Sequence, residues 1–256
     1  MIDLRIADDV ATVVLDSPAK LNALDETALR DLDAAYREAE AAAVRALVLR
    51  GEGRAFCAGR DISGVDPRHD DVPGYLDGLV TPLLQRMAAF PAPTFAAAQG
   101  ASLGVGLGLL IATDVVYVAD DAKIGSPFAT LGATLDSGGH ALFYERLGAH
   151  RTLDLIYSGE LLSGAEAVRS GLFSRALPAA ELTDAITAAA QGAARGATAA
   201  FLASKRLIAR LRDERLGLWT AMTDENRAQA ALCDTDDYRE GFAAFQEKRT
   251  PVFRGA

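Results

Sequence analysis

The sequence predicts a layered α/β fold whose last third becomes helical. Short runs of Leu and β-branched residues at Val10–Leu15 ("VATVVL") and Val44–Leu49 ("VRALVL") are typical of buried strands. Between these runs, Glu26–Ala41 carries apolar residues at helical spacing with charged residues elsewhere, which indicates an amphipathic helix. This β-α-β order predicts helices packed on a sheet that contains parallel strands.

The alternation continues through the middle of the chain. Thr94–Ala98 and Val115–Val118 read as further strands, separated by a helix rich in Ala, Gly and Leu, while Asp66–Gly74 ("DPRHDDVPG") reads as a polar surface loop. From about Ser163 onward the pattern is almost wholly helical. Apolar residues spaced for helices recur around Phe201–Leu211 and again at Phe242 and Phe245.

Composition indicates a globular enzyme. Of 256 residues, 50% are apolar and 24% are charged. The net charge of −9 argues against nucleic-acid binding, and the apolar stretches are too short to span a membrane. No secretory leader opens the chain, and two cysteines, Cys57 and Cys233, make no disulfide framework, so we expect a cytoplasmic protein.

Two glycine-rich turns are the first candidates for a binding site. Gln99–Gly108 ("QGASLGVGLG") follows a predicted strand and opens a helix, but it has neither the dinucleotide spacing nor the lysine of a phosphate loop. Free N–H groups at a helix start suit an oxygen that gains negative charge, although the glycines could also serve close packing alone. Arg54–Gly64 ("RAFCAGRDISG") is a second such turn, and two turns could aim two N–H groups at one point, as an oxyanion hole requires.

Five segments together resemble one known superfamily. They are "LNALD" (Leu21–Asp25), "GRAFCAGRDISG" (Gly53–Gly64), "QGASLGVGLGLLIATDVVYVAD" (Gln99–Asp120), "SGELLSGAEAVRSGLFSRAL" (Ser158–Leu177) and "EGFAAFQEKRTPVF" (Glu240–Phe253). In this order they resemble the enoyl-CoA hydratase/isomerase (crotonase) superfamily over nearly the whole chain.

The resemblance implies a fold, an assembly and a class of substrate. The fold would be an α/β spiral of ββα units over residues 1–197, followed by a helical trimerisation region over residues 198–256. The assembly would be a homotrimer or a hexamer formed from two trimers. The substrate would be an acyl-CoA thioester, with no metal and no cofactor beyond the coenzyme A that belongs to the substrate.

The resemblance also implies two backbone donors for the thioester oxygen. They are the N–H groups of Arg60, after "AG", and of Val105, within "GVG" where the family carries three glycines. Valine can donate the same N–H if its backbone stays helical, but not readily at positive φ.

The acidic residues depart from the hydratase pattern. A hydratase of this family uses two glutamates, and the matching positions here are Gly108 and Phe128, neither of which can transfer a proton. Asp136, in "LGATLDSGGH", is retained. It is either the N-cap of the next helix or, by resemblance, the counterpart of three acids: the base of dienoyl-CoA isomerase, the aspartate of epoxyphenylacetyl-CoA isomerase and the nucleophile of chlorobenzoyl-CoA dehalogenase. The histidine that the dehalogenase needs would fall at about Thr81.

The predicted reaction is therefore isomerisation of an unsaturated or ring-derived acyl-CoA, with Asp136 moving the proton. Apolar neighbours at Phe128, Leu131 and Leu135 should raise the pKa of this carboxyl and make it a better base. Three alternatives stay open. They are hydration by an atypical site, hydrolysis or dehalogenation with Asp136 as nucleophile, and acyl-CoA binding without catalysis.

Further residues are predicted to contact the substrate or to have only a structural role. The resemblance assigns CoA or acyl contacts to Lys20, Asp61, Ile62, Phe245 and Lys248, the pair on the last helix reaching a neighbouring subunit's ligand, although Lys20 and Lys248 could equally be solvated charges. Ala58, Phe128 and Leu131 are further candidates for substrate contact, the last two because they are apolar. Cys57 is interpreted as packing. The three histidines lack metal-ligand spacing, and His140 could instead tune Asp136.

Overall fold

A computed structural model describes residues 1–255, and its main sheet has six strands in the order β1-β2-β3-β4-β6-β9. β1 runs antiparallel to β2, and every other neighbouring pair is parallel. The strands are β1 (Ile2–Ala7), β2 (Val10–Leu15), β3 (Ala46–Gly51), β4 (Thr94–Ala98), β6 (Val115–Ala119) and β9 (Arg175–Leu177). A smaller sheet contains β5 (Ala101–Leu103), β7 (Lys123–Gly125) and β8 (Leu162–Ser163).

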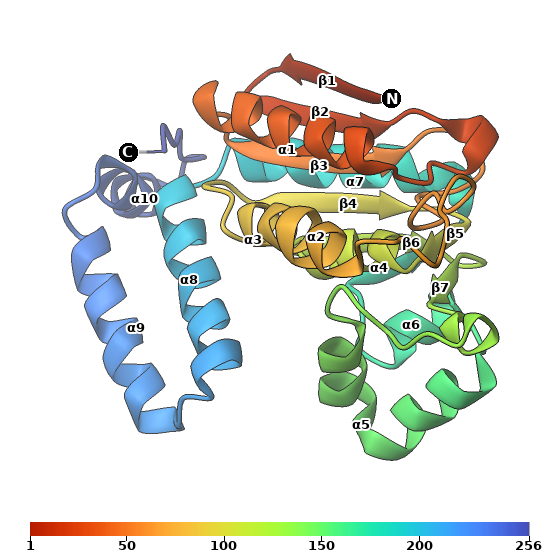
Figure 1. Cartoon of the computed structure of the whole chain (residues 1–256). Helices are drawn as coiled ribbons and strands as arrows, with labels where there is room; N and C mark the ends of the chain where they lie inside the picture. Colours follow the sequence, from red (N-terminus) through yellow and green to blue (C-terminus); the bar gives the residue numbers. More distant parts are fainter. Residues whose placement is uncertain (256) are drawn as a thin grey trace.

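Helices cover both faces of the main sheet, with α1 in front of it and α7 behind it in Figure 1. The helices up to this point are α1 (Glu26–Ala41), α2 (Val72–Tyr75), α3 (Thr81–Ala88), α4 (Val105–Ile111), α5 (Gly139–Ser158), α6 (Gly164–Arg169) and α7 (Ala179–Ala194). Three short helical turns are η1 (Pro18–Lys20), η2 (Leu76–Val80) and η3 (Phe128–Leu131). The predicted α/β alternation is therefore present.

Three further helices follow and lie to one side of the sheet, where α8 and α9 run side by side (Figure 1). They are α8 (Thr198–Glu214), α9 (Leu218–Leu232) and α10 (Asp236–Glu247). Lys205 on α8 donates to the Phe90 carbonyl and pairs with Asp114 at 3.0 Å, and Arg45 beside β3 donates to the Gly196 carbonyl at 2.6 Å. These contacts attach the helices to the core, and the predicted helical C-terminal region is present.

Some expected boundaries were wrong. Val44 does not open a strand: its N–H bonds back to Ala39, after a left-handed Ala43, so pairing starts only at Ala46 opposite Val10. The stretch after 163 is not wholly helical, because β9 adds an edge strand of three residues beside β6.

The core lies between the sheet and the helices that cover it. Its largest fully buried side chains include Tyr36 and Leu32 of α1, Leu47 and Leu49 of β3, and Leu107 of α4. Packing of this core holds the ends of β3 and β4, from which both glycine-rich turns begin. Over residues 1–255, no helix has the length and apolar character needed to cross a membrane.

Candidate active site

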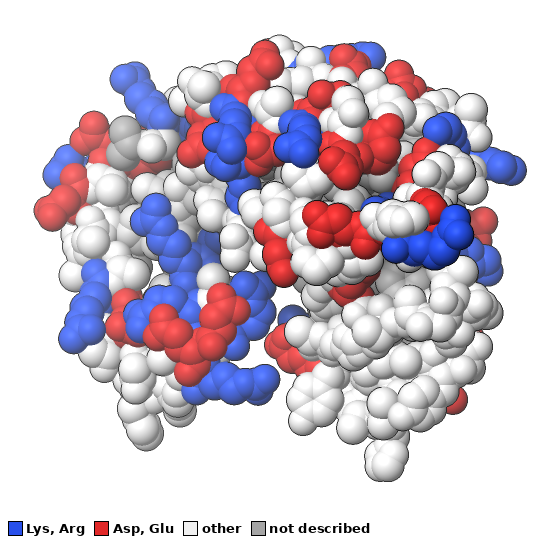
Figure 2. All heavy atoms as spheres, in the orientation of Figure 1, with Lys and Arg blue, Asp and Glu red and all other residues white. Residues whose placement is uncertain are grey.

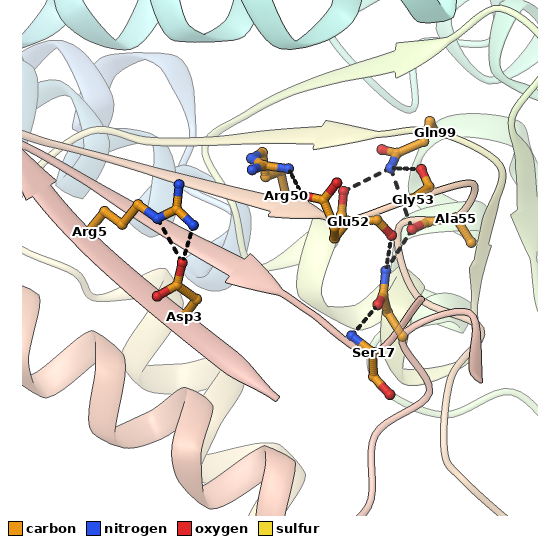
Figure 3. Close-up of polar contacts among 10 residues, drawn as sticks. Asp3, Arg5, Ser17, Arg50, Glu52, Gly53, Ala55 and Gln99 are labelled. Atoms are coloured by element: carbon orange, nitrogen blue, oxygen red, sulfur yellow. Dashed lines mark hydrogen bonds and ion pairs between the residues drawn. The ribbon is translucent and has the colours of Figure 1, made fainter. Parts of the chain in front are cut away.

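Side-chain amides clamp the turn that precedes the first glycine-rich segment. Gln99 Nε2 donates to the carbonyls of Gly51 and Gly53 at 2.8 and 3.0 Å (Figure 3). From the opposite side, buried Asn22 of the "LNALD" segment donates to the carbonyls of Glu52 and Ala55 at 2.9 and 2.8 Å. Asn22 and Gln99, from two of the motifs, thereby fix the backbone of residues 51–55, where the first glycine-rich turn begins.

The two glycine-rich turns then approach each other closely. Cys57 bridges to Ser102, and the Leu103 N–H donates to the Cys57 carbonyl at 3.0 Å. A Cβ added at Gly59 would lie 2.9 Å from the Leu103 carbonyl oxygen and 3.9 Å from the Gly104 Cα. Glycine alone lacks the Cβ that would block this approach, which explains the glycine at position 59.

The next residue in each turn supplies a free N–H. On either side of Arg60, the Gly59 carbonyl accepts from the Leu24 N–H and the Asp61 N–H donates to the Leu24 carbonyl. This alternation turns the Arg60 N–H away from Leu24. Val105 is the first residue of α4, and its backbone is helical because Gly104 takes the positive φ of 53°. Within residues 1–255, neither the Arg60 N–H nor the Val105 N–H has a hydrogen-bond acceptor.

The position of the missing glutamate on α4 is filled from another element. A Cβ at Gly108 would lie 2.6 Å from the Ser137 Cβ and 3.0 Å from the Ser137 carbonyl oxygen. A glutamate there would need the backbone of the Asp136 loop to move. Phe128, at the second glutamate position, instead packs its ring end near the start of α4, 3.0 Å from where a Gly104 Cβ would lie.

Asp136 sits half-buried in this loop, three residues before α5 begins at Gly139. It is not the N-cap, because Gly138 occupies that place and α5 has no side-chain cap. Its carboxylate instead accepts the Ser137 hydroxyl at 2.8 Å. Ser137 has φ of 51°, a conformation that costs free energy for a residue other than glycine and that tends to persist at functional sites.

Burial and one cation act in opposite directions on this carboxyl. Burial raises the pKa of Asp136, while the Ser137 hydrogen bond and the Arg60 guanidinium lower it. The net result is a raised pKa, in the direction expected of a proton acceptor near neutral pH. Leu135 is buried beside the acid, but Leu131 is 63% exposed and does not shield it.

The Arg60 side chain is itself held by residues that the sequence analysis missed. Its guanidinium makes two parallel bonds to Asp70 at 2.7 and 2.8 Å and lies 4.0 Å from the ring centroid of Tyr75. Asp70 comes from the predicted polar loop, and Tyr75 from α2, which begins inside that loop at Val72. No sequence signal could have found this pairing, because Asp70 lies in a run of charged residues typical of a solvent-exposed loop.

Predicted contacts on the other side of the first turn are also brought together. Lys20 Nζ lies 2.6 Å from Asp61 Oδ2, and this ion pair lowers the pKa of Asp61. The Ala58 N–H donates to the Leu21 carbonyl at 2.9 Å, while Ile62 is 56% exposed. Lys20, Ala58 and Asp61 are thus brought together at the turn that carries the Arg60 N–H, and Ile62 follows Asp61 directly in the chain.

Two predicted contacts lie far from this site within one chain. Phe245 and Lys248 are at the end of α10, at the opposite side of the molecule from β5 and β7 (Figure 1). Phe245 is 84% exposed. A contact with the ligand would therefore have to involve another copy of the chain, as the resemblance implied.

Other reactive side chains are held apart from the site or kept unreactive. Burial raises the pKa of the Cys57 thiol to about 12, so it carries no thiolate at neutral pH. His140 is exposed and faces Thr134 at 3.4 Å rather than Asp136. No group of three His, Cys, Asp or Glu residues in the described chain could hold a metal.

Figure 2 shows acidic and basic side chains intermixed over α1 and the C-terminal helices.

Comparison with known proteins places the whole chain in one family. The enoyl-CoA hydratase/isomerase model matches residues 5–256. A probable enoyl-CoA hydratase of Rhodobacter capsulatus is 35% identical over 251 residues, covering 98% of this chain and 96% of that protein. The 1,2-epoxyphenylacetyl-CoA isomerase of Escherichia coli is 31% identical over 256 residues, covering 98% and 97%.

Solved structures agree with this assignment and confirm the predicted fold. The crystal structure of an enoyl-CoA hydratase from Bacillus anthracis matches with a TM-score of 0.90 at 28% identity, covering 100% of this chain and 99% of that one. The motifs, the α/β core with its C-terminal helices and these similarities lead to one conclusion. The chain belongs to the enoyl-CoA hydratase/isomerase family.

Proposed function

We propose that this enzyme isomerises an unsaturated or ring-derived acyl-CoA, with Asp136 as its only proton-transfer group. The observation that carries the proposal is the replacement of the α4 acid: Gly108 leaves no room for a side chain because Ser137 packs against it, and the Ser137 hydroxyl donates to Asp136. Asp61 and Asp70 are engaged in ion pairs with Lys20 and Arg60, which leaves Asp136 as the carboxylate suited to remove a proton and return it.

The thioester oxygen would accept hydrogen bonds from the N–H groups of Arg60 and Val105. When a proton leaves the carbon beside the thioester, or the carbon conjugated to it through a double bond, negative charge moves onto that oxygen. Two preorganised amides stabilise this enolate, and removal of one such donor costs about 3 kcal/mol in comparable sites. The free N–H groups and their approach across Gly59 and Gly104 support this role.

Asp136 would then carry the proton between carbons. Its carboxylate takes the proton and becomes a neutral acid, and the enolate reforms a double bond at a new place as the acid gives the proton back. No electron acceptor and no water are consumed. The raised pKa of Asp136 supports the acceptor step, and the Ser137 hydroxyl would hold the carboxylate in one orientation.

The direct test is isomerisation of 3-hexenoyl-CoA to the conjugated 2-enoyl-CoA in heavy water. We expect turnover with deuterium entering the product, and a loss of about 10²–10⁴-fold in Asp136→Asn, as for removal of a general base. Asp31→Asn, at an exposed position of α1, is the matched control and should keep full activity. Full activity of Asp136→Asn would contradict the proposal.

Hydration is the second candidate, favoured by the names of several relatives, among them the 2,3-dehydroadipyl-CoA hydratase of Escherichia coli at 30% identity. In that reaction Asp136 would activate water toward a 2-enoyl-CoA. An assay with crotonyl-CoA distinguishes the hydratase from the isomerase. If the enzyme formed 3-hydroxybutyryl-CoA from it faster than it isomerised 3-hexenoyl-CoA, the hydratase would be favoured.

Two further outcomes would indicate other functions. A covalent acyl-enzyme at Asp136, detected by mass spectrometry, would indicate a hydrolase or dehalogenase, and tight acyl-CoA binding without deuterium exchange would indicate a binding module. We also propose a trimer or a dimer of trimers in the cytoplasm, in which exposed Phe245 and Lys248 of α10 reach the ligand of a neighbouring copy.

A further inference from the structure

The segment Leu21–Leu24 sets the direction of the Arg60 N–H. The Leu24 N–H donates to the Gly59 carbonyl at 2.8 Å, and the Leu24 carbonyl accepts the Asp61 N–H at 2.9 Å. The Gly59 carbonyl and the Arg60 N–H belong to one planar trans peptide group, so they point in opposite directions. The bond that holds this carbonyl toward Leu24 therefore aims the Arg60 N–H at the other side, where the proposed function places the thioester oxygen.

The backbone of this segment is strained. Leu21 and Asn22 follow each other in the left-handed conformation, with φ of 53° and 57°. Asparagine tolerates this conformation better than most residues, but for leucine it costs free energy, and such residues persist only where the surrounding structure holds them. The position of Leu24 therefore depends on the contacts that hold Leu21 and Asn22 in place.

The Asn22 side chain makes those contacts. It is 1% exposed, and its Oδ1 accepts the Ser17 N–H at 2.8 Å. Its Nδ2 donates to the carbonyls of Glu52 and Ala55 at 2.9 and 2.8 Å, so both N–H groups of the amide are used. A buried amide with these partners keeps one orientation, because rotation would leave polar groups without a partner. Asn22 thus joins the chain after β2, its own strained segment and the backbone that leads into the Arg60 turn.

A small movement of the Leu21–Leu24 segment would be enough to weaken the Arg60 donor. A hydrogen bond weakens steeply as its angle falls, and a misplacement of about 1 Å can cost on the order of 10²-fold in rate. The second donor, the Val105 N–H, starts α4 and is held by a different element. Loss of the Asn22 bonds would therefore move one donor relative to the other.

We propose that Asn22 is a positioning residue of the oxyanion hole: its side-chain amide holds the Leu21–Leu24 segment against the Arg60 turn and thereby aims the Arg60 N–H at the thioester oxygen. Because the amide is buried, it acts through the backbone and not by contact with the ligand. The inference rests on the proposed function in one respect, the place of the thioester oxygen, and it does not depend on proton transfer by Asp136.

The test measures polarisation of the thioester carbonyl, which reports on the donors directly and needs no turnover. Butyryl-CoA is bound with ¹²C or ¹³C at its thioester carbonyl. The difference between the two infrared spectra isolates the carbonyl stretch, whose frequency falls as hydrogen bonds to the oxygen strengthen. The spectra are recorded for the wild type and three variants, each below its own melting temperature.

The three variants separate the bonds of the Asn22 amide from the conformation of its backbone. Asn22→Asp keeps the shape and the acceptor for Ser17 but offers at most one donor in place of two. Asn22→Gly accepts positive φ without cost and removes all three side-chain bonds. Asn226→Asp makes the same substitution at an exposed position of α9, and it is the matched control.

In the wild type and in Asn226→Asp, we expect the carbonyl frequency of bound butyryl-CoA to lie below that of butyryl-CoA in water. Both Asn22 variants should lose part of this lowering and keep the rest, because the Val105 N–H still donates. In 3-hexenoyl-CoA isomerisation their kcat should fall roughly 10–10²-fold at a nearly unchanged KM, less than the 10²–10³-fold that follows outright removal of a donor.

A carbonyl frequency equal to that of the wild type in either Asn22 variant would overturn the inference. If one of these variants does not fold, the other decides, and failure of both to fold would also overturn the inference, because Asn22 would then serve the fold alone. A wild type whose bound carbonyl matched that in water would contradict the oxyanion hole and the inference together. Loss of the lowering in the Asn22 variants of an enzyme without isomerase activity would support the role of Asn22 and contradict only the proposed reaction.

Discussion

Replacing Gly108 with alanine tests whether the Asp136 loop depends on the missing side chain of α4. In an exposed helix, Gly→Ala stabilises by about 1 kcal/mol. Here the new Cβ would lie 2.6 Å from the Ser137 Cβ, 3.0 Å from the Ser137 carbonyl oxygen and 3.3 Å from Leu84 Cδ1. Because one of these atoms belongs to the backbone, the loop must shift, and such overpacking costs roughly 1–3 kcal/mol. The clash should outweigh the gain in helix propensity.

We therefore expect Gly108→Ala to lower the free energy of unfolding by about 1 kcal/mol, equivalent to a fall in melting temperature of roughly 2–4 °C for a chain of this size. Activity should fall much further. Asp136 adjoins the displaced Ser137, and a misplacement of about 1 Å can cost on the order of 10²-fold in rate.

Thermal unfolding and turnover of 3-hexenoyl-CoA are the two assays, and Gly192→Ala is the control. Gly192 lies on the exposed side of α7, and a Cβ there meets nothing within 4 Å, so that variant should be stabilised by about 0.5–1 kcal/mol and remain fully active. A Gly108→Ala protein that was as stable as Gly192→Ala and still active would refute the reasoning, because Ser137 would then be free to move without consequence.

Three further predictions concern charges and thiols. Arg60→Met keeps the backbone N–H but removes the cation that lowers the pKa of Asp136, so the acid limb of the rate–pH profile should move to higher pH. Asp70→Asn should move it to lower pH by freeing Arg60 to pair with Asp136; shifts in the same direction would contradict this electrostatic link. Asp136→Asn should raise the melting temperature at pH 7, because a carboxyl whose pKa is raised by folding binds a proton more tightly in the native state. Above the native pKa, ionised Asp136 therefore lowers the stability of the wild type. This loss of stability disappears as pH falls toward the ordinary Asp pKa of about 4, so the difference in melting temperature between variant and wild type should disappear there too. Finally, iodoacetamide at pH 7.5 should alkylate exposed Cys233 but not buried Cys57, as peptide mass spectrometry would record, and activity should survive; labelling of Cys57 in the folded enzyme would contradict its burial.

Periodicity was sufficient where an element is long or fully buried. Val10–Leu15, Glu26–Ala41 and Thr94–Ala98 have the predicted bounds, because their apolar pattern repeats over a whole strand or several helical turns. β9 escaped notice because three residues, only partly buried, carry no readable alternation. Its place in the sheet is decided by backbone pairing with β6, which is a contact between distant segments.

The site was predictable in its backbone and less so in its side chains. Gly59 and Gly104 lie where the two glycine-rich turns approach each other, and the sequence alone suggested this because a side chain would not fit there. The pairing of Arg60 with Asp70 and Tyr75 was not predictable, because the loop that supplies these residues has a polar composition typical of an unattached surface segment. Likewise, the contact of Ser137 with Gly108, where the resemblance would place a glutamate, is decided by packing between α4 and the loop before α5.

A crystal structure with bound butyryl-CoA would test the central claim most directly, because the claim is that two backbone donors and one acid converge on one thioester. We predict the thioester oxygen within about 2.7–3.2 Å of both the Arg60 and the Val105 nitrogen atoms, with the Asp136 carboxylate facing the adjacent carbons. A thioester bound elsewhere, or an oxygen that contacts neither nitrogen, would contradict the account.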